Sequence, residues 1–406
     1  MRQFVVVATI ISLGATTLCG CPKPCVSTIP AQSETLIPHP RGGGAWDLRA
    51  TPDGGFAVAG FQVSSPTSAS AGSDDAYLIK LDSEFNVQWA HAYGGSKDEH
   101  VLSVDLAEDG GYLMAGVINS EVIAGRVLTG HPTILVLKAD AEGEEIWTRT
   151  VRINVGANAA YAVCAGNDES FAVVGGAGVN ILSNHLSAAF VMKFNAAGIE
   201  QWRREYRANA TNATAATSTG DGGFSVAGYT DDVRVSVFQV NEDGDDLWTF
   251  YASDWGEFDD LILPTRIVRT RDGGYAVLCG VYNVDEMAVL KLDASGIPLW
   301  ATRVSLESFT RGYGLSEAPD GSLVAAGETS PNPPPLDIRD CARCFAVRLA
   351  EDGRVMWKRA LGGNFSSAAM AVAMRPDGTP VLAGYTLVNE SYIPRAIYLL
   401  STEPDR

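Results

Sequence analysis

The eight residues Asp293-Ala-Ser-Gly-Ile-Pro-Leu-Trp300 contain a spacing of Asp, Gly and Trp that recurs along the chain. Six copies align, and their tryptophans are separated by 58, 55, 46, 52 and 57 residues. These tryptophans are Trp89, Trp147, Trp202, Trp248, Trp300 and Trp357. Two copies depart from the pattern, since Phe85 occupies one Gly position and Ala350 one acidic position. A repeat of this length is typical of a solenoid, a propeller or another array of similar units.

Each copy predicts a β-hairpin that ends in an aromatic side chain. A short apolar run such as 287–292 precedes the motif and is rich in strand-forming residues. The Asp or Asn side chain caps the turn, and Gly supplies the positive φ that the turn requires. The Trp then opens the next strand and offers a large flat surface to a neighbouring sheet. We therefore expect these six tryptophans to dock each unit onto the next.

A second turn, most often Asp-Gly, precedes each of these hairpins and is followed by a strand that commonly ends in Ala-Gly. Asp-Gly between two apolar runs is a strong hairpin signal. The turn occurs seven times, beginning at Asp53, Asp109, Asp168, Asp221, Asp272, Asp320 and Asp377. Two hairpins per repeat give four antiparallel strands, which is the pattern of a propeller blade.

The unequal numbers of the two motifs predict how the ring closes. Seven Asp-led turns but only six Trp-led strands leave the last repeat one strand short. Residues 35–38 resemble the other fourth strands, so we predict that they complete the last blade and remove free sheet edges. The sequence thus predicts an all-β, seven-bladed β-propeller over residues 34–406, closed by an N-terminal strand. An open β-solenoid is the alternative, but it requires no borrowed strand.

The first 33 residues predict export and anchoring. Residues 1–20 have a signal-peptide pattern, in which Arg2 precedes an apolar run. Leu18-Cys19-Gly20-Cys21 resembles the lipobox of bacterial lipoproteins, which implies lipidation of Cys21 and leaves 21–33 as a tether. The alternative is a plain secretory signal with an incidental cysteine. Pro22 in place of an acidic residue favours the outer over the inner membrane of a bacterial envelope.

Composition narrows the range of partners. The net charge of −18 makes nucleic acid and anionic lipid surfaces unsuitable partners.

Cys164 and Cys279 lie in apolar runs and are predicted to be buried. Cys341 and Cys344 form a CxxC pair, for which a local disulfide is the favoured interpretation, with a redox or metal role as the alternative.

Two resemblances follow from the repeats. The Asp-x-x-Gly-x-x-x-Trp motif resembles the tryptophan-docking motif of quinoprotein-like (PQQ-like) propellers. The Asp-Gly-Gly turn with its following Ala-Gly resembles the repeats of bacterial extracytoplasmic seven-bladed propeller lipoproteins. The resemblance implies a propeller in the cell envelope. The cofactor-stacking and calcium-binding residues of quinoprotein dehydrogenases have no identifiable counterparts here, so no cofactor and no metal site is predicted.

A binding site is expected on the face that carries the variable loops, because rigid scaffolds commonly place binding residues there. Trp255 is the main candidate, since the docking repeat does not account for it. The candidate binding residues are Trp255, Asp254, Asp259, Asp260, Arg339, Asp340, Arg343 and Tyr392. Asp47, Arg49, Asp105 and Arg266 lie in the first strands near the channel, where structural ion pairs or a solvated rim are the favoured interpretation.

These features favour a binding module, predicted to be a monomer, whose partner is an envelope protein or a glycan. No residue is predicted to be catalytic, because no nucleophile elbow, phosphate-binding loop or metal-binding histidine motif occurs. Two alternatives stay open. One is an enzyme, either a quinoprotein-like oxidoreductase or a glycan-acting hydrolase or lyase. The other is a passive structural lipoprotein of the cell surface.

Overall fold

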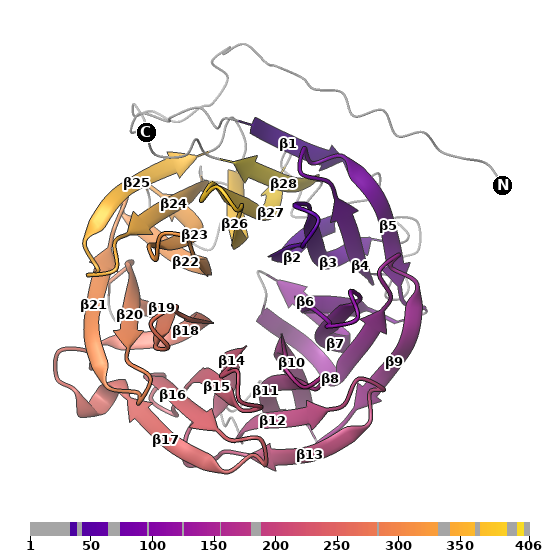
Figure 1. Cartoon of the computed structure of the whole chain (residues 1–406), viewed down its shortest axis with the longest axis horizontal. Coiled ribbons are helices and arrows are strands. Elements are labelled where there is room, and N and C mark those ends of the chain that lie inside the picture. Colours follow the sequence, from indigo (N-terminus) through magenta and orange to yellow (C-terminus); the bar gives the residue numbers. More distant parts are fainter. Residues whose placement is uncertain are drawn as a thin grey trace.

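The computed structural model shows seven four-stranded antiparallel sheets arranged as blades around a central axis (Figure 1). It describes residues 33–38, 43–63, 74–95, 97–123, 126–154, 156–179, 188–281, 284–331, 342–361, 366–387 and 396–401. The predicted all-β, seven-bladed propeller is confirmed, and the solenoid alternative is wrong. The predicted signal peptide and most of the tether lie outside the described residues.

Each blade runs from an innermost strand at the axis to an outermost strand at the rim. The innermost strands are β2 (Gly43–Ala50), β6 (Glu99–Leu106), β10 (Ala157–Ala165), β14 (Asn212–Ser218), β18 (Leu261–Arg269), β22 (Phe309–Glu317) and β26 (Ser366–Met374). The second strands are β3 (Phe56–Val63), β7 (Tyr112–Ile123), β11 (Phe171–Val179), β15 (Phe224–Tyr229), β19 (Tyr275–Val281), β23 (Leu323–Ser330) and β27 (Pro380–Leu387).

The outer half of each blade is built in the same order. The third strands are β4 (Asp74–Leu81), β8 (Arg126–Ala139), β12 (Ala188–Phe194), β16 (Val235–Val240), β20 (Met287–Leu292), β24 (Arg343–Leu349) and β28 (Ala396–Ser401). The outermost strands are β5 (Val87–Tyr93), β9 (Glu145–Val151), β13 (Glu200–Glu205), β17 (Asp246–Tyr251), β21 (Pro298–Val304), β25 (Val355–Leu361) and β1 (Ser33–Pro38). One 3-10 turn, η1 (Ala252–Asp254), follows β17.

The ring closes through the N-terminal strand, as the motif count predicts. β1 pairs antiparallel with β28, with Ser33 opposite Ser401 and Pro38 opposite Ala396. The last blade therefore combines β26, β27 and β28 from the end of the chain with β1 from its beginning. This pairing covers the outer edge of β28, which would otherwise be open to association with other chains.

The repeated tryptophans dock each blade onto the next, and the repeated glycines make room for them. A Cβ atom on Gly353, which has φ +82°, would lie 2.7 Å from the Trp300 ring of the preceding blade. Trp89, Trp147, Trp202 and Trp248 stand in the same relation to the turn glycines of the blades that follow them. Trp300 Nε1 also donates a 3.2 Å hydrogen bond to the Glu351 carbonyl. The glycine therefore serves both the turn and the aromatic contact.

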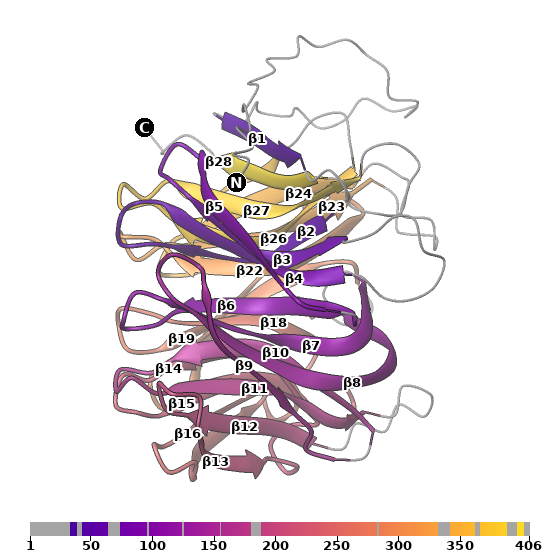
Figure 2. The same ribbon diagram turned by 90° about the vertical axis from the view of Figure 1, so that its right-hand side faces the viewer.

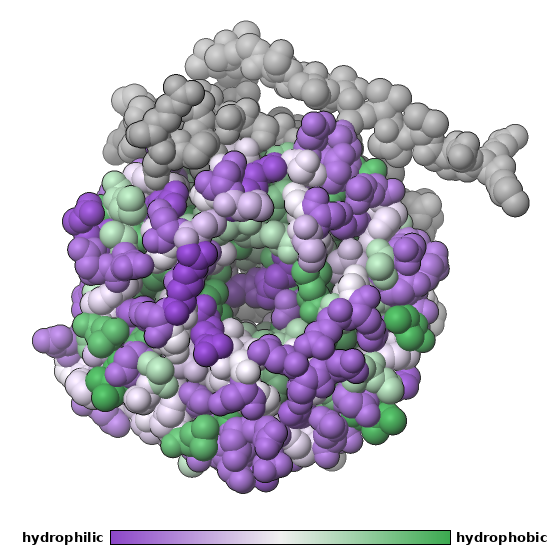
Figure 3. All heavy atoms as spheres, viewed as in Figure 1, coloured by the Kyte–Doolittle hydropathy of each residue, from purple (hydrophilic) through white to green (hydrophobic). Residues whose placement is uncertain are grey.

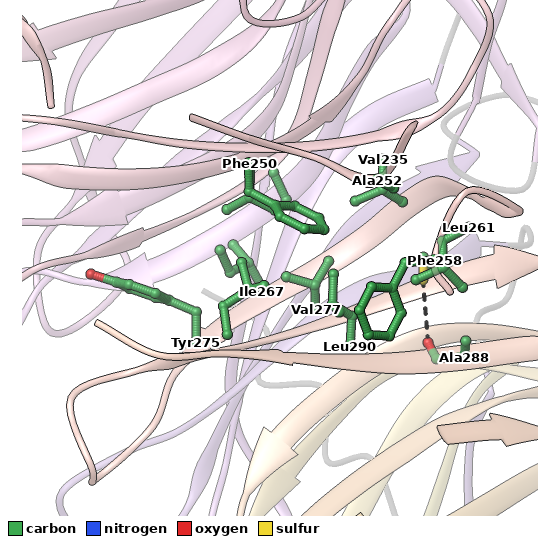
Figure 4. Close-up of a cluster of buried hydrophobic side chains, with 14 of the residues drawn as sticks. Val235, Phe250, Ala252, Phe258, Leu261, Ile267, Tyr275, Val277, Ala288 and Leu290 are labelled. Carbon is green, nitrogen blue, oxygen red and sulfur yellow. Dashed lines mark hydrogen bonds between the residues drawn. The ribbon is translucent and has the colours of Figure 1, made fainter. Parts of the chain in front are cut away.

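Apolar side chains from neighbouring blades meet between the sheets and form the core. Between the fourth and fifth blades, Phe250 and Val235 of one blade pack with Ile267, Val277 and Leu290 of the other (Figure 4). Equivalent clusters join the other blades, including the last blade with the first. The described residues contain no helix that is long and apolar enough to cross a membrane.

Candidate functional site

The two faces of the disc differ in the connections they carry (Figure 2). One face, called here the turn face, carries the Asp-Gly and Asp-x-x-Gly turns. The opposite face, called the loop face, carries the longer connections. In the second blade this connection is not a loop, because β7 and β8 continue as a paired ladder as far as Ile123 and Arg126. The loop face is therefore uneven, with one hairpin projecting from the second blade.

Trp255 lies on the loop face in a segment that is firmly attached to the core. The segment follows η1, and its backbone is closed by bonds from Trp255 N to the Ala252 carbonyl and from Phe258 N to the Trp255 carbonyl. Phe258 is 8% exposed and enters the core between the fourth and fifth blades (Figure 4). Trp255 itself is 45% exposed. An ordered segment thus holds a large aromatic side chain in solvent.

Acidic groups surround this tryptophan. Asp254 and Asp259 are exposed, and Asp260 is half-buried. Asp260 is held by a 2.7 Å ion pair with Arg303 of β21. The structure therefore brings four of the predicted binding residues together on one segment, and one of them also has a structural partner.

The predicted binding residue Arg343 is not on the surface. It is 6% exposed at the start of β24, where its guanidinium pairs with the Glu307 carboxylate. The expectation of a surface contact is therefore wrong for Arg343, because this buried carboxylate draws the side chain inward. Arg339, Asp340, Tyr392 and Cys341 lie outside the described residues. The Cys341–Cys344 disulfide thus stays a prediction, although Cys344 is buried in β24.

A charged network spans the central channel. The Asp47 carboxylate of β2 is fully buried and accepts hydrogen bonds from Arg266 of β18 at 2.6 Å and from Arg49 at 3.0 Å. Arg49 also donates to Asp105 of the second blade at 3.2 Å. Burial raises the pKa of Asp47, but Arg266 and Arg49 outweigh this effect and hold the pKa below its ordinary value. The predicted structural ion pairs near the channel are confirmed.

Large aromatic and aliphatic side chains meet in the channel, on the loop-face side of this network. Trp46, which precedes Asp47, belongs to one cluster with Leu102, Tyr161, Tyr313 and Met370 of four other blades. All five are extra residues at β-bulges, where the pairing of the innermost strand with the second strand shifts. Such bulges redirect a side chain out of the regular alternation. Here they direct one side chain from each of these five blades toward the axis.

These bulges explain the repeated glycine of the second strands, which lies within each strand and does not end it as predicted. A Cβ atom on Gly60 of β3 would lie 1.9 Å from the Gly44 carbonyl oxygen of β2. Gly116, Gly175, Gly327 and Gly384 are equally close to a carbonyl of their own innermost strand. Glycine is therefore required for the approach of the bulged strand. The sequence contained this signal, but it was interpreted only as the end of a strand.

A second repeated feature was missed at the turn face. In five blades, a nearly buried Lys or Arg of the third strand pairs with the Asp of the Asp-Gly turn, as in Lys80–Asp53 at 2.7 Å and Lys291–Asp272 at 2.8 Å. Partial burial raises the pKa of Asp53 and Asp272, but hydrogen bonds from these lysines, from a threonine and from the backbone of the turn together outweigh it and bring the pKa to about 2. These cations thus fasten the turns to the blades.

The turn face is hollowed at its centre (Figure 3). A pocket of about 270 Å³ lies there, lined by residues at the ends of β2, β18, β22 and β26 and the turns after them. Arg271, Glu317 and Arg375 provide its charged groups, and Met374 and Pro319 are among its apolar ones. No sequence motif pointed to this pocket, because its residues come from four different blades.

The remaining predictions concern cysteines and metals. Cys164 and Cys279 are buried as predicted, and burial raises the pKa of both thiols. Within the described residues, no group of three or more His, Cys, Asp or Glu side chains could hold a metal ion.

Comparisons with known proteins identify the fold. No protein-family model matches the chain, and no curated protein matches it. A solved hydrazine synthase of Kuenenia stuttgartiensis is 12% identical with a TM-score of 0.55, over 90% of this chain and 98% of that one. An oligogalacturonate lyase in complex with manganese is 14% identical with a TM-score of 0.52, over 93% and 96%. At these identities the likeness shows the propeller fold alone.

Proposed function

We propose that this protein is a lipid-anchored, extracytoplasmic binding module that contacts its partner through the loop face, with Trp255 in the contact. The observation that carries the proposal is the contrast within one short segment. Phe258 is 8% exposed and fixes the segment to the core, whereas Trp255 is 45% exposed. Large aromatic residues on a fixed support are frequent energetic centres of interfaces. Within the part of the chain that the structure describes, the docking repeat does not account for this exposed indole ring.

The charges around Trp255 narrow the class of partner. Asp254, Glu257 and Asp259 are all exposed on the same segment. Carboxylates repel phosphate backbones and anionic lipid headgroups, which agrees with the net charge of −18. An aromatic ring flanked by carboxylates suits an uncharged glycan or a protein surface with basic groups. The partner is accordingly an envelope protein or a glycan.

The direction of β1 supports a lipid anchor that leaves the loop face free. Ser33 pairs with Ser401, and Ser401 pairs with Val381 next to the turn of the last blade. The tether therefore enters the propeller at the turn face. Twelve residues separate Cys21 from Ser33, and an extended chain of that length reaches about 40 Å. Lipidation of Cys21 would hold the turn face nearer the membrane and direct the loops away from it.

Affinity capture tests the proposal. The intact lipoprotein is recovered from detergent-solubilised envelopes as wild type, Trp255→Ala and Leu247→Ala. Leu247 is a matched control, because it is 54% exposed but lies on the outermost strand β17. We expect one dominant protein or glycan with the wild type and with Leu247→Ala, and its loss with Trp255→Ala. Equal recovery by all three variants would contradict the proposed contact.

The anchor is tested separately by Cys21→Ser. We expect this variant to leave the membrane fraction while the propeller keeps its melting temperature, since Cys21 lies outside the closed ring. A Cys21→Ser variant that stays in the membrane fraction after a carbonate wash would contradict lipidation at this position.

A further inference from the structure

The pocket at the centre of the turn face is formed where four innermost strands end. Phe56 follows the turn after β2, Arg271 follows β18, Glu317 ends β22, and Met374 and Arg375 end β26. Its volume of about 270 Å³ suits one small molecule. The Asp47–Arg266 ion pair spans the channel on the loop-face side of these strand ends.

Arg375 is held in this pocket by two aromatic rings. Its guanidinium carbon lies 5.3 Å from the ring centre of Phe56 and 5.0 Å from that of Phe85. Phe85 is the residue that replaces Gly in the first copy of the repeat, and it adopts φ +68° with 5% exposure. The preceding blade ends in β1, which has no tryptophan to dock at this position. The site that elsewhere receives a docked Trp thus supports an arginine.

The Asp377 carboxylate of the same turn interacts electrostatically with Arg375, but it does not take up the hydrogen-bond donors of the guanidinium. The structure shows neither a hydrogen bond nor an ion pair from its guanidinium to any described residue. Two arginines of the innermost strands, Arg266 and Arg49, both pair with Asp47. Stacking on aromatic rings leaves the planar edge of a guanidinium available for a carboxylate. Because its position is already fixed, little conformational entropy is lost when an anion binds.

The charges of the pocket favour a single negative charge on the ligand. Arg271 and Arg375 are opposed only by Glu317 among the charged residues that line it. Both Glu317 oxygens accept the Arg271 backbone N–H at 3.1 Å, and the Arg271 guanidinium donates to the Pro319 carbonyl. One formal positive charge therefore remains among the lining residues, and the Asp377 carboxylate next to Arg375 offsets part of it. This positive charge lies on a protein whose net charge is −18. A multiply charged phosphate is less suited to it than a monoanion.

We propose that the turn-face pocket binds a small monocarboxylate, whose carboxylate pairs with the Arg375 guanidinium and whose body packs against Met374 and Pro319. The site is separate from the loop-face contact, because the two lie on opposite faces of the disc. Either proposal can therefore fail without the other. Two kinds of ligand carry such a carboxylate, namely an acidic sugar and an acid with an apolar ring.

Titration calorimetry on the detergent-solubilised, full-length protein tests this proposal. The probes are glucuronate and benzoate, and their neutral counterparts are glucose and benzamide. We expect saturable binding of at least one acid, about tenfold or more tighter than its neutral counterpart, because charge-assisted bonds to arginine are the stronger ones. Preference for glucuronate indicates an acidic sugar, and preference for benzoate an apolar acid. Saturable binding of neither acid, or equal binding of the neutral compounds, would overturn the proposal.

Variants locate the site. Arg375→Gln should weaken binding of the preferred acid by about tenfold or more, since one charge-assisted pair is lost. Arg204→Gln is the control, because Arg204 lies on the outermost strand β13, where it pairs with Asp245. The affinity of this variant for the acid should equal that of the wild type. If Arg375→Gln fails to fold, Arg271→Gln decides the question, because it lowers the pocket charge without disturbing the Phe56–Phe85 stack. Unchanged affinity in a folded Arg375→Gln, or in Arg271→Gln in that case, would overturn the proposed site.

Discussion

Arg266 Nη2 lies 2.6 Å from Asp47 Oδ1, although the two residues are 219 positions apart and belong to the fifth and first blades. These blades are not neighbours, so the ion pair spans the channel instead of a blade interface. Asp47 also accepts bonds from Arg49 and from the Ser103 hydroxyl of the second blade. One fully buried carboxylate thus connects three blades at the axis.

Asp47→Ala should destabilise the protein by roughly 3–5 kcal/mol, because removal of one member of a buried pair leaves the opposing charge uncompensated. Urea unfolding followed by circular dichroism measures the change. Arg204→Gln removes an exposed pair at the rim and should leave the unfolding midpoint unchanged. Equal midpoints for Asp47→Ala and the wild type would show that the pair does not brace the ring.

Substitution of two glycines with the same φ angle can distinguish the cost of backbone strain in the turn from the loss of tryptophan docking. Gly54 and Gly353 both have φ +82°, but a Cβ on Gly54 meets nothing within 4 Å, whereas one on Gly353 lies 2.7 Å from Trp300. Both Ala variants carry a strain of about 1–2 kcal/mol for the left-handed backbone. Gly353→Ala should also displace Trp300 and lower the free energy of unfolding further. Identical stabilities of the two variants would argue against the docking contact.

The closing strand can be tested by two truncations. Removal of residues 1–30 keeps β1 (Ser33–Pro38), whereas removal of 1–40 deletes it and exposes the edge of β28. We expect the longer truncation to melt at a lower temperature and to associate as its concentration increases, because open sheet edges pair with other chains. Light scattering and thermal melts of both truncations provide the comparison. Matching behaviour would mean that β1 is dispensable for closure.

Acid should weaken the turn face in a defined pH window. The pKa of Asp272 falls from an ordinary value of 3.8 to about 2 in the folded protein, where the opposing effect of partial burial is outweighed by hydrogen bonds from Lys291, Thr270 and Gly274 together. A carboxyl with a depressed folded pKa stabilises the fold above its unfolded pKa and loses that contribution as the pH falls toward its folded pKa. The melting temperature should therefore decline between about pH 4 and pH 2.

Lys291→Met removes the cation and provides the control for this window. Its Asp272 pKa should return toward the ordinary value, so the decline in melting temperature between these pH values should be smaller than in the wild type. An identical decline in both proteins would show that the Lys–Asp pair makes no contribution.

The scaffold could be predicted from local motifs, whereas contacts between distant repeats could not be predicted from the sequence. The roles of Gly296 and Trp300 could be predicted from spacing, because the repeat places its turn glycine four residues before its docking tryptophan. The closing strand followed from a count of motifs. The pocket at Arg375 was missed, because Phe56, Phe85 and Arg271 meet it only after the ring closes.

The candidate binding residues also show that only local features could be predicted from the sequence. Trp255 could be singled out because the repeat did not account for it. The burial of Arg343 depends on Glu307, which lies 36 positions away in the connection before β22, so no local pattern indicated it. The ladder that extends β7 and β8 was likewise hidden, because its sequence lacks the strict alternation of a regular strand.

The central claim, that the loop face binds a partner through Trp255, is tested most directly by photo-crosslinking in intact cells. A photoreactive amino acid is placed at position 255 and, as the control, at position 247 on the outer rim. We expect one discrete adduct from position 255 and none from position 247, with the same adduct in independent preparations. No adduct from position 255, or the same products from both positions, would contradict the claim.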